Sequence, residues 1–331
     1  MSGRVVFAGL GQMGFHMARH VDAAAAERGV AFSAFDIEPT ARQRMVDATT
    51  ADRPKSATLD ENGTKGEPSH QELGKLAVID ALPGDLGTGD VLCLSVPDGK
   101  ATRAAVASLG PLDGAGGLTI LDFSSVSPAD ARAIAAGLEP FGVTYLDAPV
   151  TGGVVGADQG TLTTIVGAGE EALADVRWIP ESFSGRVVAA GTIGAGALLK
   201  TINNMIFNIG SLATMEGIVV ARKAGIPDDT LLEVLNNGTA ATWFTGVRYP
   251  KYIRTRRFDA GMRVGLVNKD LGIALDAAAE QGCDLRLCGL GREMWADALA
   301  ALGPDADSTL MMDVVARATA GAGILDLLED A

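Results

Sequence analysis

Short apolar runs alternate with longer helical patterns through the first half of the chain. The apolar runs are too short for helices and predict strands at Val5–Ala8, Ala31–Phe35, Val91–Val96, Leu118–Phe123, Val143–Leu146 and Thr163–Val166. The stretches between them are rich in alanine at helical spacing and predict helices at Met13–Ala26, Thr40–Ala48, Lys100–Leu109 and Ala129–Leu138. This alternation predicts an α/β fold, in which a doubly wound parallel sheet carries helices on both faces.

The pattern changes after Gly194, where strand-like runs stop and helical patterns follow one another. They predict helices at Ala195–Ala224, Asp228–Asn236, Asn268–Gln281, Gly289–Leu302 and Ser308–Ala318. The first would be roughly 45 Å long, enough to cross a small domain. A chain of 331 residues is expected to form two domains. We therefore predict an α/β domain over residues 1–193 and an all-α domain over residues 194–331, with this long helix at its centre.

One polar stretch, from Asp47 to Glu72, has no periodic apolar face and is predicted to be a long loop. A tolerated surface insertion is the favoured interpretation, because long insertions in surface loops cost little stability. A lid over the nucleotide end of the site is the alternative.

Composition excludes several classes of partner. Hydrophobic residues make up 47% of the chain and charged residues 21%, as in ordinary soluble globular proteins. The formal net charge of −14 argues against nucleic-acid binding, which depends on clustered lysine and arginine.

Membrane insertion and secretion are not expected either. Polar residues interrupt the long apolar helix at Lys200, Asn203, Asn204, Asn208 and Glu216, which makes it a poor membrane span. The three cysteines, Cys93, Cys283 and Cys288, show neither a disulfide framework nor zinc-type spacing. We expect a cytoplasmic protein, since the chain also opens directly on a strand rather than on a leader.

The motif Gly9-Leu10-Gly11-Gln12-Met13-Gly14 follows the first predicted strand and opens the first helix. In this context Gly9 permits a tight turn, Gly11 lets a pyrophosphate approach the backbone, and Gly14 allows close packing of helix on sheet. The positive end of the helix favours phosphate binding. The motif therefore predicts a Rossmann-type dinucleotide site.

Asp36 ends the second predicted strand, at the position where a carboxylate would accept hydrogen bonds from the adenosine ribose hydroxyls. Such a carboxylate repels a 2′-phosphate, and Glu38 adds a second negative charge nearby. Arg42 and Arg44 follow closely and could reach a 2′-phosphate. The charges favour NAD, with NADP the less favoured cofactor.

Lys200 and Asn204 stand four residues apart, on one face of the long helix. An ammonium and a carboxamide there could hold one small polar molecule, and an apolar setting would lower the pKa of Lys200 towards neutrality. Taken alone, a surface lysine at the start of a helix is the simpler interpretation. Histidine bases are disfavoured as alternatives, because the three histidines all lie in the first half of the chain.

Two of these histidines, His16 and His20, share one face of the first helix at a spacing that could chelate a metal ion. No carboxylate or cysteine cluster accompanies them in the sequence, and two ligands rarely suffice. We expect no metal site.

The segment Thr151-Gly152-Gly153 lies just beyond the fifth predicted strand, at the sheet edge where open α/β sheets bind ligands. Consecutive glycine amides beside a hydroxyl form a nest for an anion such as a substrate carboxylate. A flexible turn is the alternative interpretation.

Four ordered motifs resemble the β-hydroxyacid dehydrogenase family, which includes 3-hydroxyisobutyrate dehydrogenase and tartronate semialdehyde reductase. Gly9 to Ala18 is similar to the cofactor loop of the family, and Asp147 to Gly153 to its substrate-binding motif. Gly194 to Asn204 resembles its catalytic motif, and Lys269-Asp270-Leu271 its later cofactor-proximal motif. The resemblance extends over nearly the whole chain.

This resemblance implies a hydride transfer between NAD and a small 3-hydroxy acid or its semialdehyde. Lys200 would exchange the proton, Asn204 would orient the reacting oxygen, and Thr151, Gly152 and Gly153 would hold the carboxylate. The nicotinamide side would be lined by Val96, Pro97 and Ser125, with Lys269 closing the site. It also implies a homodimer or homotetramer joined through the helical domain.

Departures from the family pattern leave the substrate open. Thr151 replaces the usual serine, and decarboxylating relatives carry histidine where this chain has Asn203 and glutamate where it has Phe207. We therefore expect oxidation without decarboxylation. An imine reductase or a non-catalytic nucleotide-binding scaffold is the alternative, although both usually lack the lysine that this chain keeps at position 200.

Overall fold

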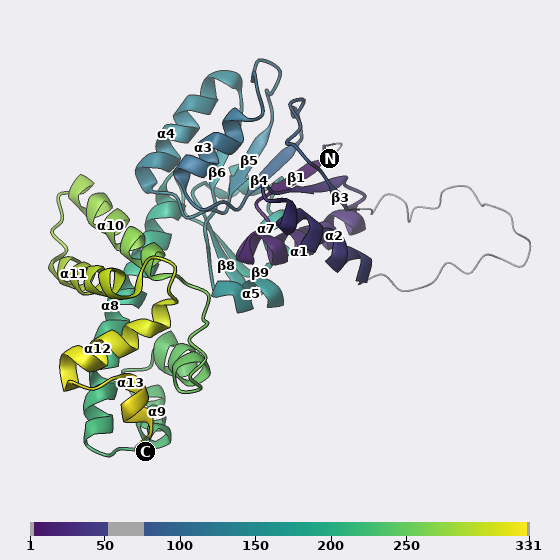
Figure 1. Ribbon diagram of the computed structural model, residues 1–331. Coiled ribbons are helices and arrows are strands. Elements are labelled where there is room, and N and C mark those ends of the chain that lie inside the picture. Colours follow the sequence, from purple (N-terminus) through teal and green to yellow (C-terminus); the bar gives the residue numbers. More distant parts are fainter. Residues whose placement is uncertain (1–2, 52–75, 330–331) are drawn as a thin grey trace, which may run out of the picture. The chain divides into compact units, whose positions relative to one another are not determined.

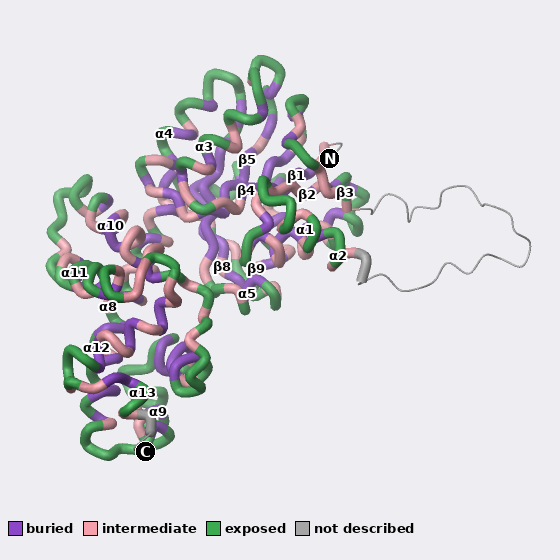
Figure 2. Tube along the Cα trace, viewed as in Figure 1, coloured by how far each residue is buried: buried purple, intermediate pink, exposed green. Residues whose placement is uncertain are grey.

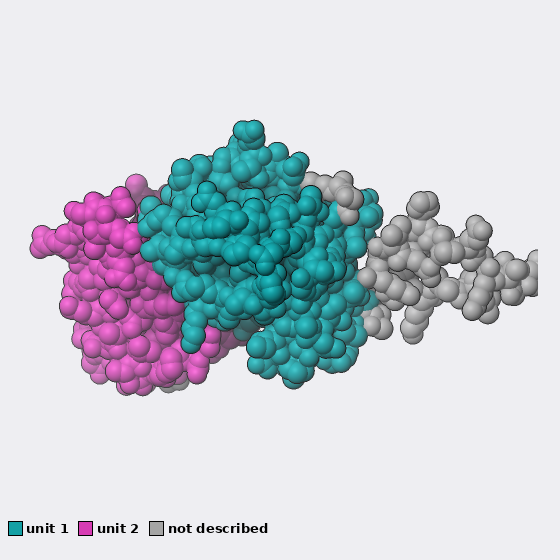
Figure 3. Space-filling view, turned by 90° about the horizontal axis from the view of Figure 1, so that it is seen from above, with its two compact units in different colours: residues 1–200 teal, residues 201–331 magenta. Residues whose placement is uncertain are grey.

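The computed structural model describes residues 3–51 and 76–329 (Figure 1). The chain forms two compact units, residues 1–200 and 201–331 (Figure 3). The units meet within the long helix, so the domain boundary at residue 193 stays a prediction. Most of the polar segment proposed as a loop or lid lies outside the described residues.

The main sheet of the first unit has six parallel strands in the order β3-β2-β1-β4-β5-β6. In chain order they are β1 (Val5–Ala8), β2 (Phe32–Phe35), β3 (Ala77–Val78), β4 (Val91–Leu94), β5 (Thr119–Asp122) and β6 (Thr144–Asp147). The strand order reverses between β1 and β4, which creates the crevice where such sheets bind ligands. The predicted doubly wound fold is confirmed.

Each face of this sheet packs against its own helices, because successive side chains of a strand point to opposite faces. Val5 and Phe7 join a core with α1 (Gln12–Arg28), and Val6 and Ala8 join a second core with α4 (Pro128–Leu138). All four side chains are buried, and Figure 2 shows burial concentrated along the sheet strands. Figure 1 places α3 (Gly99–Ala107) beside α4 and α2 (Pro39–Ala51) beside α1.

The predicted boundary between helix and loop at Asp47 is wrong, because α2 continues to Ala51. Two local hydrogen bonds support the extra turn: Gln43 donates to Asp47 at 2.8 Å, and the Thr49 hydroxyl donates to the Met45 carbonyl at 3.0 Å. The sequence of this last turn, Ala48 to Ala51, has no periodic apolar face, so the apolar pattern ends before the helix does.

A second, three-stranded sheet in the first unit has the order β7-β8-β9. It consists of β7 (Val150–Thr151), β8 (Leu162–Val166) and β9 (Ser184–Ala189), with α5 (Gly153–Gln159), α6 (Glu170–Leu173) and α7 (Trp178–Glu181) in its connections. The strand predicted at Thr163–Val166 therefore belongs to this mixed sheet rather than to the main one. Its partner β9 was not predicted, because none of its residues is buried and they give no clear apolar run.

The second unit is helical throughout its described residues 201–329, as predicted. Its elements are most of α8 (Ala195–Lys223), then α9 (Asp228–Asn237), a π-helix (Phe244–Ile253), α10 (Val264–Glu280), α11 (Arg286–Leu302), a short 3-10 helix (Ser308–Leu310), α12 (Met311–Ala320) and α13 (Ile324–Glu329). Trp295 and Tyr249 are the largest side chains fully buried in its core. The π-helix was not predicted, since its apolar residues do not recur at α-helical spacing.

Within residues 3–51 and 76–329, α8 is the one helix that length and composition would allow to cross a membrane. A core helix of a soluble protein satisfies the same criteria.

Candidate active site

The glycine-rich loop joins β1 to α1 and has the shape that a bound pyrophosphate requires. Gly9 has φ +99°, and a Cβ atom there would lie 2.2 Å from the Ser95 carbonyl oxygen. A Cβ at Gly14 would lie 1.9 Å from the Gly9 carbonyl oxygen, so both positions exclude a side chain. At Gly11 the same construction meets open space. The loop thus leaves room for a ligand beside the Gly11 backbone, at the amino end of α1.

Asp36 follows β2 and reaches this loop. The Leu10 amide donates a 2.6 Å hydrogen bond to the Asp36 carboxylate, and the Glu38 amide donates another at 2.8 Å. Two backbone donors therefore hold the carboxylate beside the glycine motif, as a ribose acceptor requires.

Two arginines of α2 also bind this corner through backbone carbonyls. Arg42 donates to the carbonyl of Asp36 at 2.6 Å, and Arg44 donates to the carbonyl of Gly11 at 3.1 Å. Both guanidinium groups are thus engaged near the predicted ribose end. Asp36 and Arg44 therefore both bind the glycine-rich loop directly, the carboxylate through the Leu10 amide and the guanidinium through the Gly11 carbonyl.

The segments after β4 and β5 form the next part of this sheet edge. The Val96 amide donates a 2.9 Å hydrogen bond to the hydroxyl of Ser124, which is buried. Pro97, which is exposed, and Ser125, which is partly buried, follow these two residues in the chain. Ser124 was not among the predicted site residues, yet it fixes the position of Val96.

Asp122 lies beneath these segments and is fully buried. It accepts hydrogen bonds from Thr102 at 2.9 Å, from Tyr145 at 2.8 Å and from the Ser124 amide at 3.0 Å. Burial raises the pKa of this carboxyl, and the three donors oppose that rise. These hydrogen bonds stabilise the chain where β5 ends, next to the candidate site.

Asp147, at the end of β6, anchors the start of α8. Its carboxylate accepts hydrogen bonds from the amides of Gly194 and Ala197, each at 2.8 Å, and it is fully buried. It thereby satisfies two amides at a helix start that no preceding turn could satisfy. A Cβ at Gly196 would lie 2.4 Å from the Ile165 carbonyl oxygen, so the small residues of the motif allow close contact between helix and sheet.

The predicted substrate loop lies between β7 and α5. Gly152 has φ +128° and Gly153 φ +69°, and both are exposed, while Thr151 is partly buried. These positive φ angles explain why glycine occupies both positions. The loop follows Asp147 by a few residues, so it shares a short segment with the anchor of α8.

His16 and His20 connect α1 to α5 through Asp158. His16 Nδ1 lies 2.9 Å from the Asp158 carboxylate, and His20 Nε2 lies 3.0 Å from the Asp158 carbonyl oxygen. Among residues 3–51 and 76–329, no cluster of three or more potential metal ligands occurs.

Lys200 and Asn204 are both partly buried on α8, one turn apart. The Asn204 amide nitrogen donates a 2.8 Å hydrogen bond to the Asp270 carboxylate, and Lys269 Nζ lies 3.9 Å from the same carboxylate group. Within the helical unit, the structure thus brings Asn204 and the Lys269-Asp270 pair together. Asp270 was missed as a site residue. The proximity of Lys269 to the cofactor stays a prediction.

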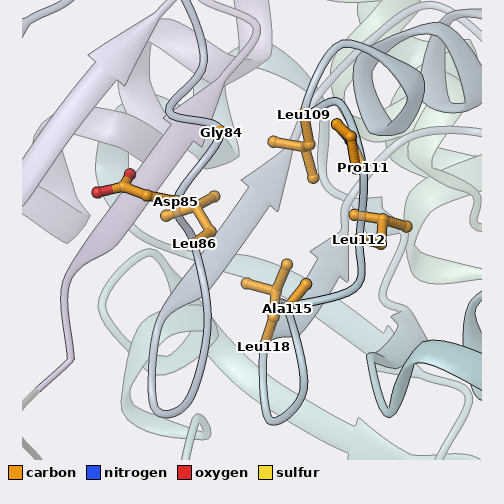
Figure 4. Close-up of a pocket in the computed structure, with 9 residues that line it drawn as sticks. Gly84, Asp85, Leu86, Leu109, Pro111, Leu112, Ala115 and Leu118 are labelled. Atoms are coloured by element: carbon orange, nitrogen blue, oxygen red, sulfur yellow. The ribbon is translucent and has the colours of Figure 1, made fainter.

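A separate hollow of about 280 Å³ opens beside β4 and β5 at their amino ends. Figure 4 shows Leu86, Leu109, Leu112 and Leu118 around it, with the Asp85 carboxylate turned outward. This carboxylate pairs with Arg4 at 2.6 Å. The hollow therefore lies at the edge of the sheet opposite to the glycine-rich loop and is not part of the candidate site.

The sheet topology, the glycine-rich loop and the Asp36 carboxylate define a dinucleotide-dependent oxidoreductase. Residues 4–191 match the NAD binding domain of 6-phosphogluconate dehydrogenase, and residues 194–315 match the NAD-binding domain of NADP-dependent 3-hydroxyisobutyrate dehydrogenase. The chain belongs to the β-hydroxyacid dehydrogenase family. It is an NAD(P)-dependent dehydrogenase acting on a CH–OH group.

Individual relatives agree with this assignment. A probable 3-hydroxyisobutyrate dehydrogenase of Mycobacterium tuberculosis is 31% identical over 285 residues, which cover 84% of this chain and 86% of the relative. A 2-(hydroxymethyl)glutarate dehydrogenase of Eubacterium barkeri is 30% identical over 219 residues, 62% of this chain and 73% of the relative. The solved structure of Mycobacterium tuberculosis 3-hydroxyisobutyrate dehydrogenase with L-serine has a TM-score of 0.77 at 28% identity, covering 97% of this chain and 100% of that chain.

Proposed function

We propose that this protein oxidises the hydroxyl group of a small 3-hydroxy acid with NAD, or reduces the matching semialdehyde, without decarboxylation. The observation that carries the proposal is the anchoring of α8 by Asp147. It places the helix that bears Lys200 directly against the strand end that leads into Thr151, Gly152 and Gly153. This contact supports the proposal because Asp147 connects the start of the helix that bears the proposed proton-transfer group to the chain that leads into the proposed anion-binding loop.

The proposed roles follow from the chemistry of these groups. The amides of Gly152 and Gly153 and the Thr151 hydroxyl hold the substrate carboxylate. Lys200 removes the proton from the substrate hydroxyl, and the carboxamide of Asn204 orients the same oxygen. Bound NAD supplies the hydride acceptor, held by the glycine-rich loop and by Asp36. The residues Val96, Pro97, Ser125 and Lys269 complete the cofactor side of the proposal.

The names of the relatives define the substrate class more closely. 3-Hydroxyisobutyrate, L-serine and 2-(hydroxymethyl)glutarate are all 3-hydroxypropanoates with different substituents at C2. A chain similar to both dehydrogenases, and to a solved structure that contains L-serine, fits a 2-substituted 3-hydroxypropanoate, whose common carboxylate and primary alcohol match the anion loop and the lysine. NAD is the proposed physiological cofactor because Asp36 is fixed on the loop, with NADP as the second possibility.

The direct test is NAD reduction by purified protein with a panel of 2-substituted 3-hydroxypropanoates. Lys200→Ala is expected to abolish turnover and to leave the dissociation constant for NAD largely unchanged. Loss of NAD binding in this variant would place Lys200 in a structural role. Tight NAD binding without turnover of any panel member would instead favour the non-catalytic scaffold, and turnover of cyclic imines alone would favour the imine reductase.

We further propose a cytoplasmic homodimer or homotetramer joined through the helical unit. Exposed apolar side chains on its helices support self-association: Ile206 is 63% exposed, Val234 65%, Leu290 59% and Leu287 73%. The cysteines Cys93, Cys283 and Cys288 are free thiols, as in a reducing compartment. Light scattering on the purified protein tests the oligomeric state.

A further inference from the structure

Arg248, in the π-helix of the second unit, forms no ion pair with an acid among residues 3–51 and 76–329. Its side chain is only 7% exposed. The guanidinium carbon lies 5.0 Å from the Phe207 ring centre and 5.6 Å from the Trp243 ring centre. Nη1 donates a 2.8 Å hydrogen bond to the Ser308 hydroxyl, whereas Nε is buried with no hydrogen-bond partner among the described residues.

The carboxylate whose charge acts on this guanidinium, that of Asp307, forms no ion pair with it. Asp307 acts on Arg248 only through space, and its carboxylate accepts hydrogen bonds from the Gly261 amide at 2.8 Å and the Thr309 amide at 2.9 Å. Burial lowers the pKa of Arg248. A buried charge without a counter-ion is costly to keep, and an anionic ligand would offset that cost.

The free edge of the guanidinium has the form that a carboxylate requires. Nη1 donates one of its two N–H groups to Ser308, and the N–H groups of Nε and Nη2 lie side by side on another edge of the guanidinium. Two parallel N–H groups of this kind bind a carboxylate in a bidentate manner. Trp243, which is 45% exposed, connects the cluster to the surface.

The cluster is also placed next to the candidate site within the helical unit. Phe207 follows Asn204 by three residues, and side chains three apart lie on the same face of a helix. The two positions differ by about 4.5 Å along the helix axis. A carboxylate on a two-carbon arm extends about 5 Å from the carbon that bears it. The spacing thus suits a substrate with a short acidic arm.

We propose that Arg248 binds a second carboxylate, carried on the C2 substituent of the 3-hydroxypropanoate substrate, and so selects dicarboxylic substrates. The inference rests on the proposed function for the identity of the reacting end. Phe207 and Trp243 both pack against the guanidinium, and the hydroxyl of Ser308 fixes its orientation. The predicted preference is for an arm such as that of 2-(hydroxymethyl)glutarate over the methyl group of 3-hydroxyisobutyrate.

The kinetic test compares these two substrates in the full-length wild-type protein and in Arg248→Met. Wild type is expected to favour 2-(hydroxymethyl)glutarate at least 10-fold in kcat/KM. Arg248→Met should lose about 100-fold on that substrate and less than 3-fold on 3-hydroxyisobutyrate. The control is Arg257→Met. Arg257 is exposed, follows the π-helix, and pairs with Asp259 at 2.9 Å. This variant should leave the ratio of the kcat/KM values for the two substrates unchanged.

Arg248→Lys keeps the positive charge but lacks the two parallel N–H groups. It provides a test if the methionine variant does not fold. It is expected to raise KM for 2-(hydroxymethyl)glutarate about 10-fold without changing kcat/KM for 3-hydroxyisobutyrate. Equal losses on both substrates, or a wild-type preference for 3-hydroxyisobutyrate, would overturn the proposal.

A binding measurement separates this proposal from the proposed function. Trp243 beside the guanidinium serves as a fluorescence reporter, and Trp243→Phe identifies its share of the signal. Titration with glutarate should change this fluorescence in wild type, and in Arg248→Lys only at about 10-fold higher concentration. If no hydroxy acid is turned over but glutarate binds in this way, the proposed function fails and the carboxylate site stands. If glutarate produces no change in wild type, the site is refuted whatever the activity.

Discussion

The side-chain amide nitrogen of Asn204 donates a 2.8 Å hydrogen bond to the carboxylate of Asp270, 66 residues further along the chain. Asn203 in turn donates a 3.3 Å hydrogen bond to the carbonyl oxygen of the Asn204 side chain. The side chain of Asp270 is only 11% exposed. The carboxamide proposed to orient the substrate oxygen is therefore itself held in one orientation by a partly buried acid on α10.

Replacing Asp270 with alanine should free the Asn204 side chain while leaving the amide in place. A hydrogen bond to a charged group is worth about 1.5–3 kcal/mol, which corresponds to roughly a 10- to 100-fold loss of kcat. Steady-state kinetics with a saturating 3-hydroxy acid measure this change. Asn203→Ala serves as the control and should have a smaller effect. An unchanged kcat in Asp270→Ala would show that Asn204 does not depend on this contact.

Asp147→Ala should lower both the free energy of unfolding and kcat. The substitution leaves the buried amides of Gly194 and Ala197 without an acceptor, at a cost of about 1–3 kcal/mol for each unsatisfied group. The start of α8 would then shift, and Lys200 with it. Urea unfolding gives the loss of stability, and kcat reports the displacement. A stability loss with normal kcat would mean that the start of α8 is held in place without this carboxylate.

The pH dependence of stability tests the burial of Asp147 more finely. Burial raises the pKa of its carboxyl above the ordinary value of 3.8, opposed by hydrogen bonds from the Gly194 and Ala197 amides. The folded state therefore binds the proton more readily than the unfolded state between these two pKa values. In that window the carboxyl's contribution to stability falls as pH rises and grows as pH falls.

Asp147→Asn lacks this titration and serves as the reference. The free energy of unfolding of wild type, relative to the variant, should increase as the pH is lowered from neutrality towards 4. Urea titrations of both proteins at several pH values measure the difference. A difference that shrinks on acidification would mean that the hydrogen bonds outweigh burial and that the pKa is lowered instead.

Local periodicity accounts for most of what could be predicted of the fold. Five of the six main-sheet strands contain buried apolar residues and were predicted from them. The pattern is weak where burial is weak: β3 was not predicted and has no buried residue, nor does β9, and the last turn of α2 depends on side-chain contacts of Thr49 and Gln43. The π-helix has a period that an α-helical template does not detect.

The residues of the candidate site also fall into two groups, those that a local motif predicts and those that it does not. Lys200, Asp36 and the glycines belong to short motifs, so the sequence alone points to them. Asp270 and Arg248 act through partners 66 and 60 residues away, Asn204 and Ser308. No local pattern reports such pairs, because they depend on how distant helices pack. Asp147 was placed in the substrate motif, but its contact with the start of α8 became visible only in the folded chain.

Gly196→Ala tests the close contact between α8 and the sheet. The added Cβ would lie 2.4 Å from the Ile165 carbonyl oxygen and 2.9 Å from the Gly167 amide nitrogen, so the helix start has to move. We expect a loss of roughly 1–3 kcal/mol in the free energy of unfolding together with a lower kcat.

The matched control is Gly210→Ala, on the same helix, where a Cβ meets open space. Alanine there should stabilise the protein by up to about 1 kcal/mol through helix propensity, with kcat unchanged. If both variants behave alike in urea unfolding and in turnover, steric contact at Gly196 is not what sets the position of α8.

Asp36→Asn tests the choice of cofactor. Asparagine keeps an oxygen that can accept the 2.6 Å hydrogen bond from the Leu10 amide, so the loop should keep its shape while the negative charge is lost. The ribose hydroxyls lose a charged acceptor, worth about 1.5–3 kcal/mol, so kcat/KM for NAD should fall about 10- to 100-fold. Repulsion of a 2′-phosphate is relieved at the same time, so kcat/KM for NADP should rise. Glu38→Gln, the exposed control, should change the ratio of kcat/KM for NAD to kcat/KM for NADP less. Equal losses with both cofactors in Asp36→Asn would show that Asp36 only holds the loop in shape.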